Sequence, residues 1–388
     1  MSPTISDQLV DVFGPAPETP VTSHAPGRVN LIGEHTDYNQ GFVLPTILGC
    51  EVEVAVRRSP AARVRLHAVD LNDTLAYGPG DEPDDSWPGW APYLVGVIEE
   101  MRGRGLLDGG LDLAVTGSVP RGSGLSSSAA LETATALALA RVFEAQLDPM
   151  GMVQLCQDVE HHWAGVRCGI MDQMACRLGQ PGHALLIDCG DNSHRHIPLD
   201  LGDHDLVITD SGVRRELADS AYNDRRRECL EGMAQLQRQA PTIVSLRSVG
   251  SEVLDAHESG LLPHLARRCR HVVDENARVL EAAEALSHGD LVALGQLMNS
   301  SHDSLRDLFE ASHPDVDHLV DTARSVPGVL GSRLTGAGWG GCTVTLCARA
   351  ATTTLRRRLE EELATTGAPG QVMLPGRPRA AGIAEASP

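Results

Sequence analysis

The stretch VPRGSGLSSSAALETA, residues 119–134, decides the fold because it joins a strand pattern to a helix pattern through a loop of glycine and serine. Upstream, residues 111–119 alternate apolar and polar side chains, which is typical of a half-buried strand. Downstream, residues 129–145 are rich in alanine and leucine and predict a helix. The loop therefore lies where a helix begins, with few large side chains to cover its backbone.

A helix that begins behind such a loop is suited to bind phosphate. Its first turn leaves backbone N–H groups unpaired and carries a partial positive charge, and glycine lets a ligand approach the backbone closely. The alternative is a flexible turn that ends in a serine N-cap, but a cap needs one serine and residues 126–128 supply three. The chain has no lysine, so this is not a Walker A loop. Charge neutralisation must come from backbone amides, Mg²⁺ and arginine.

A second glycine run, GAGWGG at residues 336–341, fits the spacing G-x-G-x-x-G. The dinucleotide-binding fingerprint with this spacing requires a helix directly after the glycines. The residues that follow, CTVTL, are β-branched and predict a strand. We therefore reject a dinucleotide site here and expect a tight turn.

The composition favours a cytoplasmic protein with small-molecule ligands. The chain has 388 residues, enough for about two domains. Its net charge of −20 argues against nucleic acid or an anionic membrane as a partner. Nine cysteines are scattered without a C-x-x-C pair, which indicates a reducing compartment and neither a disulfide framework nor a zinc site. We expect no secretory leader and no membrane-spanning segment.

The remaining patterns predict a mixed α+β protein, and we expect two lobes. Residues 1–20 resemble a loose lead-in, and residues 79–92 an acidic surface loop. Apolar runs predict strands at 183–189 and 205–211, and the polar residues between them are typical of a crossing between domains. Further helices are predicted at 151–164, 213–237, 262–287, 289–298 and 315–325.

The segment APGRVNLIGEHTDYNQG, residues 25–41, is a candidate binding loop. It places Arg28, Glu34, His35 and Asp37 among glycines, so that donors and acceptors of both charges lie close together. Such a set suits a polyhydroxyl ligand, because each sugar hydroxyl can both donate and accept. A solvated loop with internal salt bridges fits these residues equally well.

The segment DVEHHWAGVRCGIMDQMA, residues 158–175, holds two carboxylates of interest. Glu160 lies near the end of one predicted helix and Asp172 at the start of another. One carboxylate could bind Mg²⁺ beside the phosphates and another could take a proton from an attacking hydroxyl. The alternative is that Glu160 faces solvent and Asp172 only complements a helix dipole.

Taken together, these segments resemble the galactokinases of the GHMP sugar and metabolite kinases. GRVNLIGEHTDYNQGFVLP is similar to the galactokinase signature, PRGSGLSSSAALE to the superfamily's phosphate loop, and GSRLTGAGWGGCTVTL to its third motif. CGIMDQ, SAYNDRRRECL, RCRHVVDEN and LMNSSHDSLRD match in order and spacing. The resemblance covers roughly residues 20–350. In the third motif, Trp339 stands where a phenylalanine is usual. The departures are His313, where a cysteine is usual, and the loosely fitting C-terminal end PGRPRAAGIAEASP, and neither touches the predicted chemistry.

The resemblance implies a two-lobed α+β GHMP kinase fold, with lobes at 1–200 and 201–388 and the active site in the cleft between them. It implies Mg²⁺, ATP as co-substrate, and phosphorylation of the anomeric hydroxyl of α-D-galactose, the first committed step of the Leloir pathway. Asp172 would be the base and Arg28 its neighbour. The sugar would contact Glu34, His35, Thr36, Asp37, Gly169 and Tyr222. The phosphates would contact Gly122, Ser123, Gly124, Leu125, Ser126, Ser127 and Ser128, and Mg²⁺ would contact Ser128 and Glu160.

Two other functions are compatible with the same motifs. One is a kinase for another sugar, such as N-acetylgalactosamine or arabinose, because a few pocket residues decide specificity. The other is a catalytically dead relative that senses sugar and ATP to control transcription. Such sensors can carry lesions in the serine loop, whereas GLSSSAA is whole here and Asp172 and Arg28 are present. We expect a monomer.

Overall fold

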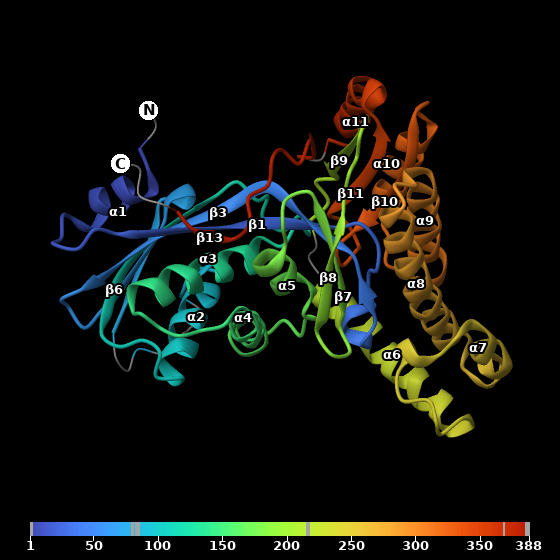
Figure 1. Cartoon of the computed structure of the whole chain (residues 1–388), viewed down its shortest axis with the longest axis horizontal. Coiled ribbons are helices and arrows are strands. Elements are labelled where there is room, and N and C mark those ends of the chain that lie inside the picture. The colour runs from blue at the N-terminus through green and yellow to red at the C-terminus, as the bar shows by residue number, and fades with distance from the viewer. Residues whose placement is uncertain (1–2, 79–80, 82–85, 215–217, 368, 385–388) are drawn as a thin grey trace.

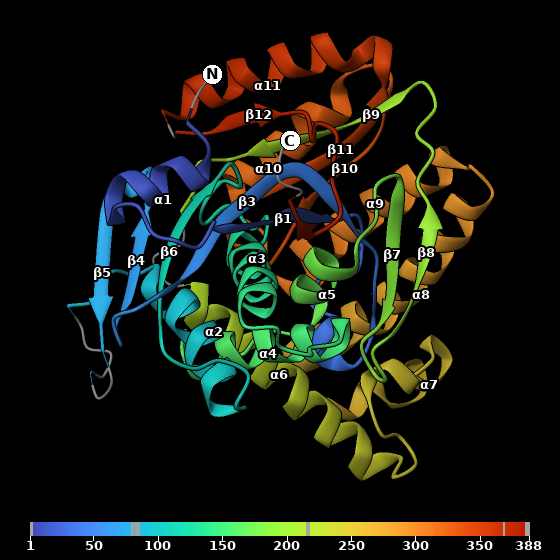
Figure 2. The same ribbon diagram turned by 60° about the vertical axis from the view of Figure 1, so that its left-hand side comes forward.

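The computed structural model describes residues 3–78, 81, 86–214, 218–367 and 369–384. Two β-sheets form the framework, and helices cover them (Figure 1). The large sheet lies towards one end of the molecule with α1 to α5 around it, and the smaller sheet lies towards the other end beside α8 to α11 (Figures 1 and 2). This arrangement of two sheets covered by helices agrees with the α+β class that the resemblance implied.

The large sheet runs in the order β13-β1-β3-β6-β4-β5, and β2, β7 and β8 join it through β3. Its strands are β1 (Val21–Asn30), β2 (Phe42–Val43), β3 (Pro45–Ser59), β4 (Val64–Ala68), β5 (Asp73–Tyr77), β6 (Gly110–Gly117), β7 (His183–Asp188), β8 (Ser193–Pro198) and β13 (Gly382–Ile383). β4 and β6 are parallel, and the other pairs are antiparallel. All its strands except β13 precede residue 200.

Alternating side chains of the central strands give the large sheet two apolar faces. Val54 and Val56 of β3 pack in the main core with helix α3 (Ser127–Val142). Ala55, on the opposite face, packs with Ile5 and Leu9 of helix α1 (Ile5–Phe13). The sheet is therefore covered on both sides, and α3 crosses directly under β1 and β3 with the glycine–serine loop at its N-terminus.

The smaller sheet consists of strands from the second half of the chain. Its order is β10-β11-β9-β12, with β9 (His204–Asp210), β10 (Val329–Thr335), β11 (Cys342–Ala348) and β12 (Gln371–Met373). Ile208 and Val344 of this sheet belong to the same buried cluster as Val54 and Val56 of the large sheet. The division of the chain near residue 200 stays a prediction.

The helices predicted from the sequence lie close to their predicted positions, whereas those at residues 91–103 and 251–257 were not predicted. The helices other than α1 and α3 are α2 (Ala91–Gly103), α4 (Pro149–His162), α5 (Met171–Leu178), α6 (Ala218–Gln239), α7 (Ser251–His257), α8 (Pro263–Ser287), α9 (Leu291–Ser304), α10 (Pro314–Ser325) and α11 (Thr352–Thr366). A π-helical turn, residues 305–309, continues α9. Within the described ranges, no helix is long and apolar enough to cross a membrane.

Two predicted loops were wrong. The lead-in, residues 1–20, contains α1, which begins with a capping box between Thr4 and Asp7 and buries Ile5 and Leu9. The polar stretch 190–204 contains β8, an edge strand antiparallel to β7 whose exposed side chains hide the strand pattern. In the acidic loop predicted at 79–92, residues 79–80 and 82–85 lie outside the described residues, residues 86–90 form turns, and a helix begins at Ala91.

Candidate functional site

A pocket of about 1260 Å³ opens between the phosphate loop, the segment after β1 and the helices α4, α5 and α6. Pockets for one small ligand commonly measure about 300–1,000 Å³. This one has room for two ligands side by side. Its walls include most of the residues singled out from the sequence, and they lie in four separate parts of the chain.

The glycine–serine loop is curled by backbone conformations that ordinary residues avoid. Gly122, Gly124 and Ser126 have positive φ angles of 67°, 84° and 59°. Ser126 precedes the first residue of α3, and its buried side-chain oxygen has no hydrogen-bond partner in the protein. Ser127 and Ser128, both half-buried, line the pocket at the N-terminus of the helix, where unpaired amides favour an anion.

Two members of the predicted phosphate loop do not line the pocket. The Ser123 hydroxyl is buried and donates to the Pro120 carbonyl at 2.7 Å. The Leu125 side chain lies in the main core, while its carbonyl accepts the Arg28 N–H at 3.2 Å. These two residues fix the shape of the loop, and Gly122, Gly124, Ser126, Ser127 and Ser128 form the surface that a ligand would meet.

Arg28 joins the phosphate loop to the predicted base. Its Nε and Nη2 donate to Oδ1 of Asp172 at 2.8 and 2.6 Å, and its Nη1 donates to the Gly124 carbonyl at 2.6 Å. Both bonds to Asp172 use one oxygen, so Arg28 leaves Oδ2 unused. Burial opposes the charge of Arg28, but Asp172 outweighs this effect and raises the pKa of the guanidinium.

The position of Asp172 agrees with a role at the reacting atoms. It lies in the first turn of α5, lines the pocket and has a side chain that is 28% exposed. The predicted alternative of a bare dipole partner does not account for its bidentate contact with a buried arginine. Its role as the base stays a prediction.

The segment after β1 presents three of its four predicted sugar residues to the pocket: Glu34, His35 and Asp37. Thr36 is fully buried, and its hydroxyl lies within hydrogen-bond distance of the Gly33 and Phe42 carbonyls, at 2.8 and 2.6 Å. Thr36 thus stabilises the turn through backbone contacts and is not part of the pocket wall.

Asp37 and Gly169 lie in close contact. A Cβ on Gly169 would be 2.0 Å from Oδ2 of Asp37, so glycine is required there. Burial, together with the nearby charge of Asp172, raises the pKa of Asp37 to about 6. The pocket therefore holds a carboxyl group that changes charge just below neutral pH.

His35 sits among aromatic rings. Its ring centroid is 5.7 Å from that of Tyr222 and 5.8 Å from that of Trp339. Its Nδ1 lies 2.8 Å from the Tyr38 hydroxyl and its Nε2 lies 3.0 Å from the Ala337 carbonyl. Tyr222, on α6, also lines the pocket, and burial raises its pKa well above the usual value.

Ser128 and Glu160 both line the pocket and could bind a divalent cation together with a nucleotide. The described residues contain no group of three or more His, Cys, Asp or Glu side chains suited to hold a metal alone. Mg²⁺ commonly uses one or two carboxylates and completes its octahedron with phosphate oxygens and water. The Ser128 hydroxyl and the Glu160 carboxylate fit this preference of Mg²⁺.

The structure adds residues that the sequence did not single out. Trp90 and Tyr93, at the start of α2, line the pocket with Leu71 and Val115 and offer flat, apolar surfaces. Arg214 lies near Gly122 and pairs with Asp210 through two contacts of 2.8 Å. Aromatic residues make up only 3% of the chain, so their concentration in SWPGWAPYL was an available signal.

Comparison with known families finds three matches along the chain. Residues 9–58 match the galactokinase galactose-binding signature, residues 92–180 the GHMP kinases N terminal domain, and residues 282–365 the GHMP kinases C terminal. Together these ranges include the turn of Glu34, the phosphate loop and the strands β10 and β11.

Comparison with individual proteins gives the same family. The chain is 46% identical to a galactokinase of Roseiflexus sp. over 88% of this chain and 87% of the relative. It is 43% identical to a galactokinase of Canis lupus familiaris over 91% and 90%. The structure of Lactococcus lactis galactokinase complexed with galactose superposes with a TM-score of 0.91 at 32% identity, covering 98% of this chain and 99% of that one. A mevalonate kinase at 18% identity and a TM-score of 0.64 shares the fold.

Proposed function

The chain belongs to the galactokinases of the GHMP kinases, and we propose that it transfers the γ-phosphoryl group of ATP to the anomeric hydroxyl of α-D-galactose, giving galactose 1-phosphate and ADP. One observation carries the proposal. A single pocket brings together the turn of Glu34 and Asp37, the Arg28–Asp172 pair and the glycine–serine loop. A sugar, a base and a triphosphate can therefore meet in one place.

The sugar lies against the turn after β1. Glu34, His35 and Asp37 supply acceptors and donors, and the backbone at Gly169 and the Tyr222 hydroxyl complete the wall. A hydroxyl-rich ligand needs groups that can both accept and donate, and this set contains carboxylates, an imidazole and a phenol. The close contact between Asp37 and Gly169 fixes the position of one carboxylate against the pocket floor.

Asp172 acts as the general base. The proton of the anomeric hydroxyl passes to Oδ2 of Asp172 as the sugar oxygen forms a bond to the γ-phosphorus, and the bond from that phosphorus to the β-γ bridging oxygen breaks. Arg28 keeps Oδ1 fixed and holds the phosphate loop through Gly124. Its positive charge lies near the transferring group, where it stabilises the negative charge of the transition state.

ATP binds along the phosphate loop. Its phosphates contact the loop surface formed by Gly122, Gly124, Ser126, Ser127 and Ser128. Its adenine ring lies near Trp90 and Tyr93, whose faces suit a planar ring. Ser128 and Glu160 would hold Mg²⁺, which would offset the negative charge of the phosphates. The serine loop is whole and the base and arginine are paired, which favours an active kinase over a sugar sensor.

The decisive experiment is a phosphorylation assay across a sugar panel that includes galactose, N-acetylgalactosamine, arabinose and glucose. ADP release measured with a coupled assay should give the highest kcat/KM with galactose. A higher value with N-acetylgalactosamine or arabinose would change the substrate. No turnover with any sugar, together with sugar and ATP binding by calorimetry, would favour the sensor.

We further propose that the enzyme works as a monomer in the cytoplasm, without nucleic acid or membrane partners. None of the nine cysteines forms a disulfide, which supports a reducing compartment. The net charge of −20 disfavours association with polyanions. Size-exclusion chromatography with light scattering should give the mass of one chain, 41.3 kDa.

A further inference from the structure

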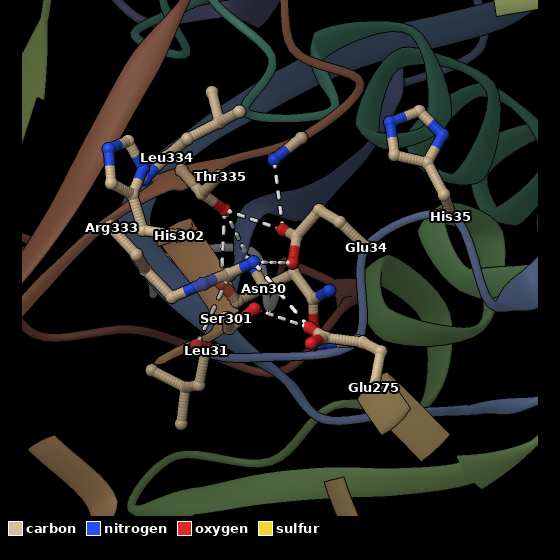
Figure 3. A network of polar contacts seen from close by, with 12 residues as sticks. Asn30, Leu31, Glu34, His35, Glu275, Ser301, His302, Arg333, Leu334 and Thr335 are labelled. Atoms are coloured by element: carbon tan, nitrogen blue, oxygen red, sulfur yellow. Dashed lines mark hydrogen bonds and ion pairs between the residues drawn. The ribbon is translucent and has the colours of Figure 1, made fainter. Parts of the chain in front are cut away.

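Glu34 is held by a buried network that reaches it from the far half of the sequence. Figure 3 shows its carboxylate facing Arg333 and Thr335 of β10, while the neighbouring His35 points the other way. Nη2 of Arg333 forms a salt bridge with Oε2 of Glu34. The Gly336 N–H donates to Oε1 at 3.0 Å, and the Thr335 hydroxyl lies within hydrogen-bond distance of both Oε1, at 3.3 Å, and the Asn30 carbonyl, at 3.0 Å.

These contacts leave Glu34 little freedom. A carboxylate offers about four acceptor positions. Arg333 and Gly336 occupy two, and the Thr335 hydroxyl lies beside a third, so about one or two remain for a sugar hydroxyl. The direction of the remaining positions depends on how the network holds the carboxylate.

Arg333 is central to the network because it contacts both the side chain and the backbone of the sugar-binding segment. Its side chain is fully buried, and its Nη1 donates to the carbonyls of Asn30 and Leu31 at 3.3 and 3.2 Å. Arg333 does not line the pocket. Its guanidinium thus fixes the end of β1 and the Glu34 carboxylate with one rigid fork, which lysine could not reproduce.

Helix α8 supports the same segment from another side. Glu275 accepts the Gly33 N–H at 2.9 Å and the Arg278 Nε at 2.7 Å, and lies 3.8 Å from Arg333. Burial opposes the charge of Glu275, but Arg278, His271 and Arg333 lower its pKa to about 2. Two carboxylates and two guanidiniums therefore balance in this cluster, and removing Arg333 would leave one buried negative charge in excess.

We propose that Arg333 is a positioning residue for the sugar: it sets the orientation of the Glu34 carboxylate and thereby the affinity for galactose, although it does not line the pocket. The inference deepens the proposed function and rests on the contact of Glu34 with the sugar. The same geometry links the two ligand sites, because the carbonyl oxygen of Gly124 in the phosphate loop lies 3.0 Å from the position that a Cβ on Gly336 would occupy. The residues around Arg333 therefore approach the phosphate loop through backbone packing. Replacing Arg333 should mainly change the affinity for the sugar.

The test compares Arg333→Gln and Arg333→Lys with the wild type in steady-state kinetics and galactose calorimetry without ATP. Arg333→Gln should raise the KM and Kd for galactose about 10- to 100-fold, as expected when one member of a buried charge pair is removed. The KM for ATP should stay close to that of the wild type. Arg333→Lys keeps the charge but not the fork, so its galactose KM should lie between the two.

Arg324→Gln is the matched control. Arg324 donates to the Ser332 carbonyl of β10 and to the Asn299 carbonyl of α9, but it contacts neither Glu34 nor the pocket. This variant should lower the melting temperature without changing the galactose KM. If Arg333→Gln does not fold, the galactose KM of Arg333→Lys is compared with that of the wild type instead.

Two results are decisive. Suppose that an Arg333 variant has the same lowered melting temperature as Arg324→Gln but the galactose KM of the wild type. Arg333 would then have a purely structural role, and the inference would be overturned. Glu34→Gln separates this failure from that of the proposed function. If Glu34→Gln binds galactose like the wild type, Glu34 is not a sugar contact and the site assignment fails, whatever Arg333 does.

Discussion

Replacing Asp172 with asparagine tests the assignment of the base directly. Asparagine has nearly the same shape, and its side-chain oxygen can still accept both hydrogen bonds that Arg28 donates at 2.8 and 2.6 Å. The atom that takes the place of Oδ2 becomes an amide nitrogen, which cannot accept a proton. The geometry of the pocket is kept while the proposed chemistry is removed.

The size of the effect follows from what each contact does. Loss of a general base lowers turnover about 10²- to 10⁴-fold, or about 2.7–5.4 kcal/mol of activation free energy. The bond from Arg28 to the Gly124 carbonyl does not involve Asp172, so the phosphate loop keeps its shape. We therefore expect an ATP KM close to that of the wild type. Folding stability should fall by about 1–3 kcal/mol, because hydrogen bonds from Arg28 to a charged acceptor become bonds to a neutral one.

The assay is steady-state ADP release with galactose and ATP varied separately, combined with thermal melts with and without nucleotide. Asp158→Asn is the control, since Asp158 also pairs with an arginine, Arg104, at 2.7 Å but lies outside the pocket. It should leave kcat unchanged. A kcat for Asp172→Asn within tenfold of the wild type, in a protein that still binds ATP, would refute the role of Asp172 as the base.

Three further predictions concern the rest of the pocket. Gly169→Ala would place a Cβ 2.0 Å from Oδ2 of Asp37, so the carboxylate must move and the galactose KM should rise about tenfold or more, while an unchanged KM would show that Asp37 does not contact the sugar. Ser128→Ala should shift the Mg²⁺ titration of activity to higher concentration, and an identical titration would argue against Ser128 as a ligand. The pKa of Asp37 is raised from 3.8 to about 6, so its ionised carboxylate, which accepts hydrogen bonds, is present above pH 6 and lost below it. The galactose KM should therefore rise as the pH falls through 6. In Asp37→Asn this rise should vanish, and a rise that persists would assign it to another group.

Much of the framework was predictable because local patterns agreed with the final packing. The strand before the glycine–serine loop and the helix after it were found within a few residues, since their periodicity coincides with burial against the main core. The helix α1 was missed because only Ile5 and Leu9 are buried along its short length. The strand β8 was missed because it is an edge strand with mostly exposed, polar side chains.

Motifs indicated the site but not the division of tasks within it. Thr36, Ser123 and Leu125 belong to the recognisable segments, yet their side chains stabilise turns or the core and do not line the pocket. Nothing in a linear sequence distinguishes a hydroxyl that bonds to a backbone carbonyl from one that faces a ligand. The contact between Glu34 and Arg333 spans 299 residues, so only the folded chain reveals it.

The charges of the pocket support the prediction that a divalent cation takes part in a protein without lysine. The pocket is lined by four arginines, Arg28, Arg121, Arg167 and Arg214, and by five carboxylates, Glu34, Asp37, Asp70, Glu160 and Asp172. Arg28 and Arg214 are already paired with Asp172 and Asp210. The side chains alone therefore supply no surplus of positive charge for a triphosphate. Backbone amides at the start of α3 provide part of the compensation, and a divalent ion between Glu160, Ser128 and the phosphates would provide the rest. We therefore expect activity to depend on Mg²⁺ more strictly than in an enzyme whose phosphate loop carries a free lysine.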